Sequence, residues 1–229
     1  MRRPAALFPV VLALSATILA SASAQAQDGQ EQGPIKIKKC QVINQSGSYV
    51  LANNLSGQSP ANNNCLFITA SFVTIDLAGF TISGNGAGIS SSQQSEGIAV
   101  RNGTIVGGFG GVALFGTGSI VEEVRVLPGM GHGITVVDGI VKGNIVVGRS
   151  AGAGILATGT VTGNYVENNG VGLNAFQGST VIGNTALNND TGILVYCPSN
   201  LTNNTATGSS VLNIQLSGEG CNNTNNVAP

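Results

Sequence analysis

The chain carries little charge of either sign. Of its 229 residues, 9 are Lys or Arg and 10 are Asp or Glu, so that 8% of the residues are charged and the net charge is -1. There is no basic patch to hold the phosphates of a nucleic acid and no acidic run to hold a cationic partner. The composition therefore argues against nucleic acid as a partner.

The chain also lacks the spacings of a zinc site. It has 4 cysteines and 1 histidine, and no C-x-x-C pair, which disfavours a four-cysteine metal centre. An even number of cysteines in an exported chain indicates disulfides. Three connectivities are open. We expect the sequence-local pairs Cys40 with Cys65 and Cys197 with Cys221, one near each end of the repetitive region.

Beyond the N-terminus, no apolar run is long enough to span a bilayer. The first 26 residues combine a positive start at Arg2 and Arg3, an apolar run from 5 to about 22 and an A-x-A site at 24–26. This order is typical of a cleaved secretory signal peptide, with a retained membrane anchor as the alternative. We expect residues 1–26 to be removed and the remainder to be secreted or periplasmic, with no membrane span.

Helical periodicity is missing as well, because apolar residues do not recur at spacings of 3, 4 and 7. Short runs alternate with a period of two instead, as in Val161-x-x-Asn164-x-Val166, which is typical of strands. Glycine, with 34 residues, and asparagine fill the positions outside the core. Both tolerate the left-handed backbone of tight corners.

A similar sequence motif recurs about every twenty residues. A glycine followed by an aliphatic residue stands at 88, 111, 133, 154, 172 and 192, in steps of 23, 22, 21, 18 and 20. A second column has a constant spacing of 20 and consists of Val124, Asn144, Asn164, Asn184 and Asn204. A fixed period of this length indicates a repeat architecture.

Short strands with this period stack if the chain climbs one strand spacing, about 4.8 Å, per coil. One predicted core column is Ile89, Val112, Ile134, Ile155, Leu173 and Ile193, and another is Ile105, Val126, Val146, Val166, Ala186 and Ala206. The asparagines would form a ladder of stacked, hydrogen-bonded amides. The predicted fold class is all-β: a single-stranded right-handed parallel β-helix (solenoid) of about seven coils, roughly 34 Å long, with disulfide-tied ends.

From 50 to 216 the chain resembles the right-handed parallel β-helix repeat proteins, the pectate-lyase-like scaffold, through "YVLANNLSG", "VTIDLAGFTISG" and "VRNGTIVG". The resemblance implies the fold and leaves the function open, because this scaffold carries lyases, hydrolases, epimerases and adhesins. We expect a signal peptide at 1–26, an N-terminal segment and cap at 27–49, the β-helix at 50–216 and a C-terminal tail or cap at 217–229. The stretch "PIKIKK" at 34–39 is expected to lie across the first coil.

An enzyme on this scaffold needs converging carboxylates. Calcium-dependent lyases hold the cation with several of them and add a group that abstracts a proton. The expected register places Arg101, Glu122 and Lys142 at one outward position of three successive coils, with Glu123 alongside. We interpret this ladder as cross-strand ion pairs worth about 0.2 to 1 kcal/mol each. Ca²⁺ would be a cofactor only for the lyase alternative, and the sequence indicates no other cofactor.

The single histidine is His132 in "GMGHGITV". Its G-H-G-I core resembles the catalytic histidine segment of polygalacturonases, but the N-T-D, D-D and R-I-K motifs of that family are missing, as is the D-P-H of alginate epimerases. Hydrolysis of a glycosidic bond requires two carboxyl groups. We interpret His132 as a corner residue. Arg101, Glu122, Glu123 and His132 remain the candidates of the enzyme alternative.

Aromatic side chains suggest a binding site instead. The fourth residue after the repeat glycine is Phe115, Val137, Thr158, Phe176 or Tyr196. The last two would form a small shelf that stacks on sugar rings or covers the C-terminal end, and Tyr165 is a second candidate. The leading hypothesis is an exported, non-catalytic protein that contacts polysaccharide at the cell surface or in the periplasm. The alternatives are a polysaccharide lyase or glycosidase and a structural or adhesive module, and the oligomeric state stays open.

Overall fold

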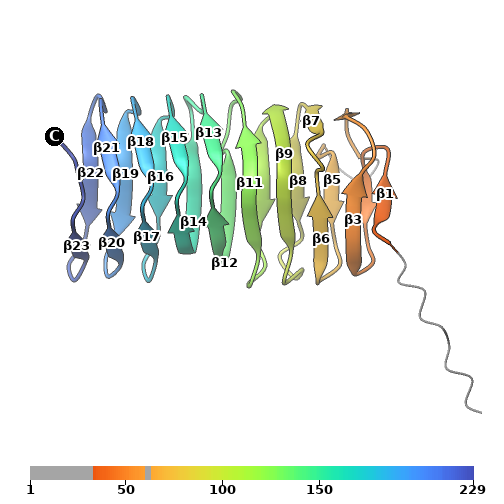
Figure 1. Cartoon of the computed structure of the whole chain (residues 1–229), viewed down its shortest axis with the longest axis horizontal. Helices are drawn as coiled ribbons and strands as arrows, with labels where there is room; N and C mark the ends of the chain where they lie inside the picture. Colours follow the sequence, from red (N-terminus) through yellow and green to blue (C-terminus); the bar gives the residue numbers. More distant parts are fainter. Residues whose placement is uncertain (1–32, 60–62) are drawn as a thin grey trace, which may run out of the picture. The chain divides into compact units, whose positions relative to one another are not determined.

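The strands of the chain pair in parallel with strands about one coil away. The computed structural model describes residues 33–59 and 63–229, and in this part it has 23 strands and no helix (Figure 1). Gln41 lies beside Leu66, and Thr180 lies beside Asn200. The chain therefore climbs as a solenoid and does not meander through hairpins. The predicted signal peptide at 1–26 lies outside the described residues.

Within the described ranges, no helix has the length and the apolar character needed to cross a membrane.

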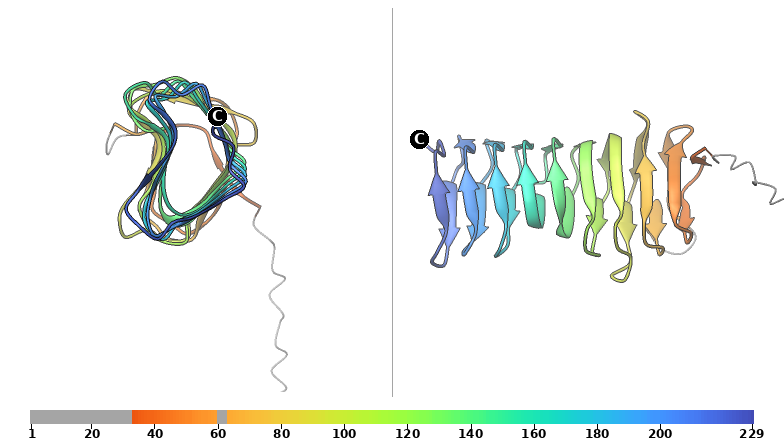
Figure 2. Two further views of the ribbon diagram at one scale, coloured as in Figure 1. Left: turned by 90° about the vertical axis from the view of Figure 1, so that its left-hand side faces the viewer. Right: turned by 60° about the horizontal axis from the view of Figure 1, so that its bottom comes forward.

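Each coil contributes to three faces, and the coils superpose when viewed along the stack (Figure 2). Face A consists of β1 (Ile35–Ile37), β3 (Gly47–Leu51), β6 (Val73–Asp76), the first part of β9 (Ala99–Gly107) and of β11 (Ile120–Val126), the last part of β12 (Ile134–Lys142) and of β14 (Ala153–Thr162), β17 (Thr180–Ile182), β20 (Asn200–Thr202) and β23 (Asn222–Thr224). Face B consists of β4 (Leu55–Ser56), β7 (Thr81–Gly84), the last part of β9 and of β11, β13 (Ile145–Val147), β15 (Tyr165–Glu167), β18 (Thr185–Leu187) and β21 (Thr205–Thr207).

Face C consists of β2 (Gln41–Ile43), β5 (Leu66–Ile68), β8 (Ala87–Ser91), β10 (Gly110–Leu114), the first part of β12 and of β14, β16 (Val171–Ala175), β19 (Thr191–Tyr196) and β22 (Leu212–Ser217). The chain passes from face C to face A to face B and then enters the next coil on face C.

Aliphatic side chains fill the inside of the coils in vertical columns. Both predicted columns are confirmed: Ile155, for example, pairs with Ile134 on one side and with Leu173 on the other, and Val146 pairs with Val126 and Val166. These core side chains are almost completely buried. The repeat glycine before each aliphatic residue has a steric cause. A Cβ at Gly172 would overlap the carbonyl oxygen of Gly192 in the next coil.

At the corner between face A and face B, a residue with left-handed backbone conformation is followed by a residue whose side chain is buried. Gly143, Gly163 and Gly183 have φ of 64°, 63° and 63°, a region in which glycine is unstrained. The asparagine after each of them is buried, and its Nδ2 donates to Oδ1 of the asparagine one coil on, at 3.0 Å for Asn144 to Asn164 and 2.9 Å for Asn164 to Asn184. Asn204 and Asn226 continue this amide column to the last coil.

A second column of buried side chains lines the corner between face B and face C. Asn169 donates from Nδ2 to Asn189 Oδ1 at 3.0 Å. One coil earlier the same position holds Arg149, whose backbone N–H donates to Asn169 Oδ1. Its guanidinium is fully buried, and Nη1 donates to the carbonyl of Gly107 at 3.4 Å. Burial disfavours the charged form and lowers the pKa of Arg149.

Both ends of the stack are tied by disulfides, as predicted. Cys40 is bonded to Cys65, and Cys197 is bonded to Cys221. The prediction of about seven coils was too low, since the solenoid has about nine turns. The pairing runs from β1 to β23 and so extends beyond the expected range of 50–216 at both ends. The stretch 34–39 does not lie across the first coil, because β1 pairs in parallel with β3 as the first strand of face A.

Candidate functional site

A groove of about 570 Å³ lies on the outer side of face C, over β8, β10 and β12. Phe109 directly precedes β10 and Phe115 directly follows it, so that the two rings stand at opposite edges of the face. Both rings are exposed, at 67% and 40%. Between them the lining includes the small residues Ala87, Gly110 and Ala113, with Thr135 and Leu156 on the following coils. The hollow therefore results from short side chains flanked by two large ones.

Asparagine side chains from the coils before β10, those of Asn64 and Asn85 among them, add hydrogen-bonding amide groups to this groove. Asn64 lines the groove with its side chain held in place: Oδ1 accepts from the N–H of Ala87 at 3.0 Å, and Nδ2 donates to Ser90 Oγ at 2.7 Å. The turn at Gly86 passes so close to Asn63 that a Cβ would overlap the Asn63 carbonyl oxygen. The groove wall at this corner is therefore closely packed backbone.

His132 lies in the groove on the coil after Phe109, at the corner that leads into β12. Its Nδ1 accepts a hydrogen bond from the N–H of Ala153 at 3.0 Å. The neutral imidazole then carries its proton on Nε2, which is left as a donor. His132 is a corner residue, as interpreted from the sequence, and it is also part of a groove, which the sequence did not indicate.

The predicted aromatic pair forms a shelf further along the same face. The rings of Phe176 and Tyr196 stack with their centroids 5.6 Å apart and an interplanar angle of 13°, and Phe176 is 43% exposed. Ser179 and Ser199 stabilise the corners behind the rings, because their hydroxyls donate to the carbonyl of Phe176 at 2.6 and 3.3 Å. The shelf and Phe115 lie at the same corner, between face C and face A.

A notch of about 490 Å³ separates Phe115 from the shelf. It is lined by Asp138 on one side, by Gln177 on the other and by Thr158 between them. At this point β12 and β14 each run continuously from face C to face A, whereas in the next coil a longer corner separates β16 from β17. The groove thus spans face C and reaches, at Phe115, the edge along which the notch and the shelf lie.

Tyr165 lies away from this edge, on the outer side of face B. Its hydroxyl donates to Glu167 Oε2 at 2.9 Å, and that hydrogen bond, followed by desolvation and the negative charge of Glu167, raises the pKa of Tyr165. The structure therefore does not bring Tyr165 together with Phe176 and Tyr196.

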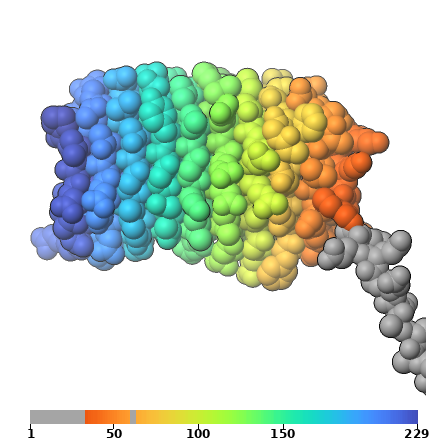
Figure 3. Space-filling model, in the orientation of Figure 1, coloured from red at the N-terminus to blue at the C-terminus, as the bar shows by residue number. Residues whose placement is uncertain are grey.

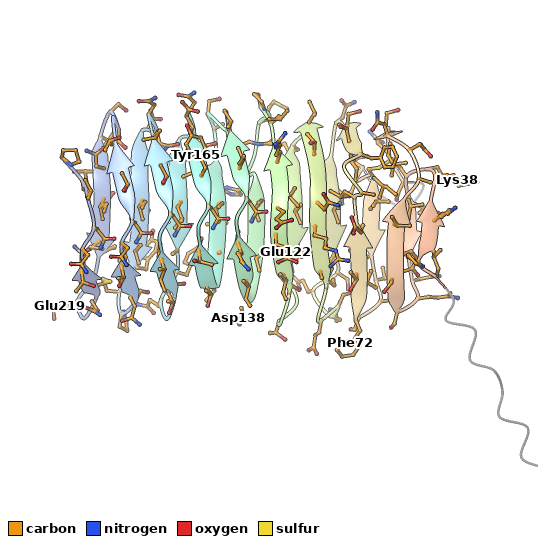
Figure 4. The ribbon with its side chains drawn as sticks, in the orientation of Figure 1. Lys38, Phe72, Glu122, Asp138, Tyr165 and Glu219 are labelled. Atoms are coloured by element: carbon orange, nitrogen blue, oxygen red, sulfur yellow. A yellow bond between two sulfur atoms is a disulfide. The ribbon has the colours of Figure 1, made fainter. Side chains whose placement is uncertain are left out.

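Three of the four catalytic candidates from the sequence lie on neighbouring coils, and His132 lies apart from them. Arg101 and Glu122 are register neighbours on face A, between Asp76 and Lys142, and Arg101 pairs with Asp76 at 3.2 Å between Nε and Oδ2. Glu123 lies at the corner between face A and face B and has a positive φ. Figure 4 shows Glu122 and Tyr165 on different coils. His132 is on the opposite side of the core, in the face C groove.

Metal ligands do not gather either. Within the described ranges, no three His, Cys, Asp or Glu side chains are placed so that they could hold a metal ion.

Two groove residues, Phe109 and Phe115, were not predicted as site residues. A signal for them exists in "GFGGVALFG", where two phenylalanines bound a five-residue strand. Phe115 is also the fourth residue after a repeat glycine, which is the position from which the Phe176–Tyr196 shelf was predicted. The sequence does not show that both rings point outward and that small side chains lie between them.

No protein-family model matches this chain, and no curated protein matches it. Among solved structures it is similar to the A-modules of the mannuronan C-5 epimerases AlgE6 and AlgE4 of Azotobacter vinelandii. The first has a TM-score of 0.43 and 13% identity over 84% of this chain and 76% of that one. The second has a TM-score of 0.42 and 13% identity over 84% and 71%. A likeness at this level assigns no activity to this chain.

Proposed function

We propose that this protein is an exported, non-catalytic carbohydrate-binding solenoid that holds a neutral polysaccharide along face C, from the groove at β10 to the Phe176–Tyr196 shelf. The observation that carries the proposal is the pair of exposed rings, Phe109 and Phe115, on either side of a hollow of about 570 Å³. Aromatic faces stack on the apolar faces of sugar rings, and their large apolar area supplies most of the binding energy of such contacts.

The polar groups of the groove support a sugar as the ligand. Asn64, Asn85 and His132 present amide and imidazole groups, which can both donate to and accept from hydroxyl groups. Pockets of this kind combine an apolar lining with a few fixed polar groups that orient the ligand. Asn64 and His132 are fixed by hydrogen bonds to backbone N–H groups of neighbouring coils.

The choice of a neutral chain follows from the groups that line the groove, which are aromatic, aliphatic, amide, hydroxyl and imidazole. The charged ladder of Asp76, Arg101, Glu122 and Lys142 belongs to face A and does not line it. A carboxylated polysaccharide placed on face C would lose hydration without gaining a cationic partner. Two disulfides are consistent with an oxidising compartment, where polysaccharides of the cell surface are found.

Length also favours a polymer over a single sugar. Three coils separate Phe115 from Phe176, which is about 14 Å at one strand spacing per coil. A ligand that contacts both would bind two weak subsites at once, and linked contacts of this kind add affinity through effective concentration. We expect oligosaccharides that reach from the groove to the shelf to bind more tightly than shorter ones.

The test is affinity electrophoresis or column retention of the purified protein on a panel of neutral and acidic polysaccharides, with and without calcium. Phe109→Ala should weaken retention on the bound neutral polymer by about tenfold, the loss of one buried aromatic contact. The matched control is Phe72→Ala, because Phe72 is 70% exposed and does not line the groove.

Each outcome decides between the three functional hypotheses. Release of reducing ends or of unsaturated products from any polymer would contradict a non-catalytic role. Retention that Phe109→Ala and Phe72→Ala weaken equally would remove the groove from the proposal. No retention on any member of the panel would favour a structural or adhesive module.

A further inference from the structure

The two ends of the solenoid differ in how well their inner side chains are covered. In the first coils Ile37, Ile43 and Leu55 are at most 2% exposed, and Ile35, in register with Tyr49, is the exposed inward residue at 48%. In the last coil the inward positions of β22 are Leu212, Ile214 and Leu216, which follow Thr191, Ile193 and Val195 in register. Leu212 is 45% exposed and Leu216 is 38% exposed. The core is therefore covered at its N-terminal end except at Ile35, whereas at its C-terminal end two of the three inward residues of β22 are exposed.

The last strand of face C also has a free edge. β22 pairs with β19 on one side, and none of the described strands pairs with its other side. It stands at the end of the stack in Figure 1, and Figure 3 shows the last coils, in blue, forming that end of the surface. An unpaired edge beside exposed apolar residues is a template for adding another strand.

We propose that this end binds the same end of a second copy of the chain, so that β22 pairs antiparallel with β22 of the copy in a two-fold symmetric dimer. With the axis at Ile214, that residue faces its own copy, and Leu212 faces Leu216 of the copy. The inward side chains then cover each other, and the backbone groups at the free edge become hydrogen-bonded. One patch meets its own copy, as a closed two-fold interface requires.

The geometry of the last coil fits this axis. The corner between face A and face B, where Asn226 ends the amide column, lies opposite face C in the coil. An axis through that corner and through the centre of β22 places Asn226 beside its own copy. Amide groups are self-complementary, because each carries donors and an acceptor.

The charges at this end also suit a two-fold arrangement. Glu219 is the ionisable side chain of the last coil's corner between face C and face A and is seen at that end in Figure 4. The two-fold axis exchanges this corner with the one before β22, so Glu219 would face Ser209 and Ser210 of the copy rather than a second carboxylate. Like charges are thus kept apart.

A head-to-tail stack is the competing arrangement, and the N-terminal end does not suit it. Of its inward residues, Ile37 and Ile43 are already covered and Ile35 is exposed, so that end presents less apolar surface to β22 than a second β22 does. A heterologous contact would also grow into open filaments, whereas the two-fold contact closes at two chains.

The experiment is sedimentation velocity of the purified protein from about 1 to about 100 µM, a range that resolves dissociation constants of micromolar order. We expect a single transition to twice the mass of one chain that stops there. Leu216→Lys and, independently, Leu212→Glu should shift this transition at least tenfold upward in concentration. Ile182→Lys is the matched control, because Ile182 is also 38% exposed but lies on the outer side of face A.

Circular dichroism melts of the same samples confirm that each variant is folded. A protein that stays monomeric over the whole range would overturn the proposal, and so would assemblies that grow beyond two chains. A dimer that Leu216→Lys and Ile182→Lys weaken equally would place the interface elsewhere and would also refute it. Loss of polysaccharide binding without a change in mass would concern only the proposed function.

Discussion

The first coils and the last coils of this solenoid solve the same packing problem in different ways. Register neighbours on face C are 25 and 23 residues apart in the first coils, at Gln41–Leu66 and Leu66–Ile89, but 20 apart at Leu173–Ile193. Where the period is 20, identical corners stack and buried asparagines hydrogen-bond from coil to coil. Where the period is longer than 20, the corners differ in length from coil to coil, and the groove on face C lies between such corners. The core runs through both regions, whereas the groove lies where the corners differ in length.

The change between the two regimes can be located. The amide column begins where Asn144 Oδ1 accepts from the N–H of Val124. Before that point the same corner holds Gly103, which has no room for a Cβ because Leu77 fills the space. The first coils thus fill the corner with an aliphatic side chain and the last coils with amides. The following predictions test this contrast, from the largest expected effect to the smallest.

Asn164→Ala should be the most damaging substitution in the regular region. Asn164 Oδ1 accepts from both nitrogens of Asn144, and its Nδ2 donates to the carbonyls of Val141 and Thr162. Several buried groups would lose their partners at about 1 to 3 kcal/mol each, so we expect the free energy of unfolding to fall by about 4 kcal/mol. Urea denaturation measures it.

Asn200→Ala is the control for that experiment, because Asn200 lies on the outer side of β20 and is exposed. It should change stability by less than about 0.5 kcal/mol. Equal losses in the two variants would mean that the amide column does not hold the coils together.

Removal of either disulfide should cost about 3 kcal/mol, because the bridges close loops of nearly equal length, with sequence separations of 25 and 24. Cys40→Ala/Cys65→Ala and Cys197→Ala/Cys221→Ala can be compared by hydrogen exchange. We expect faster exchange in the coils next to the missing bridge and unchanged exchange at the opposite end. Faster exchange along the whole chain would contradict the view that each bridge acts on its own end.

Glu123→Gly should stabilise the protein by about 1 kcal/mol. Glu123 has φ of 54° at the corner where later coils have Gly143 and Gly163, and a side chain in that left-handed region is strained by roughly this amount. Glu122→Gly, one residue earlier in β11, should destabilise the protein, because a glycine there adds conformational freedom to the unfolded chain and relieves no backbone strain. Thermal denaturation compares them, and a Glu123→Gly variant that melts at a lower temperature would show that the carboxylate has another role.

Glu167→Gln should have the smallest effect, a change of titration without a change of fold. The hydrogen bond to Glu167, together with its charge, raises the pKa of Tyr165 by stabilising the protonated phenol. Loss of the negative charge should therefore lower this pKa toward its usual value near 10. Spectrophotometric titration detects the phenolate, and a pKa that rises or stays unchanged in Glu167→Gln would refute the assigned contact.

Most of the architecture could be predicted because it is periodic. A residue and the one twenty positions later meet the same neighbours, so the columns through Ile155 and Val146 and the buried asparagines follow from spacing. Of the three possible disulfide connectivities, the sequence-local one was favoured because each pair lies near one end of the repeats, and it is the one found. The number of coils was underestimated because the first strands and the last two, β22 and β23, lack the glycine–aliphatic signature. The Phe176–Tyr196 contact was predictable for the same reason as the core: both residues occupy one position of successive coils.

That this chain coils, and which residues lie over one another, could be predicted from spacing, because a one-dimensional period translates directly into stacking. Where the surface is hollow and where the core is open could be seen only in the folded chain. The groove between Phe109 and Phe115 depends on corner lengths in three neighbouring coils, and the exposure of Leu212 and Leu216 depends on what lies beyond the last strand. Neither property is local in sequence, since each is set by the absence or presence of side chains from other coils.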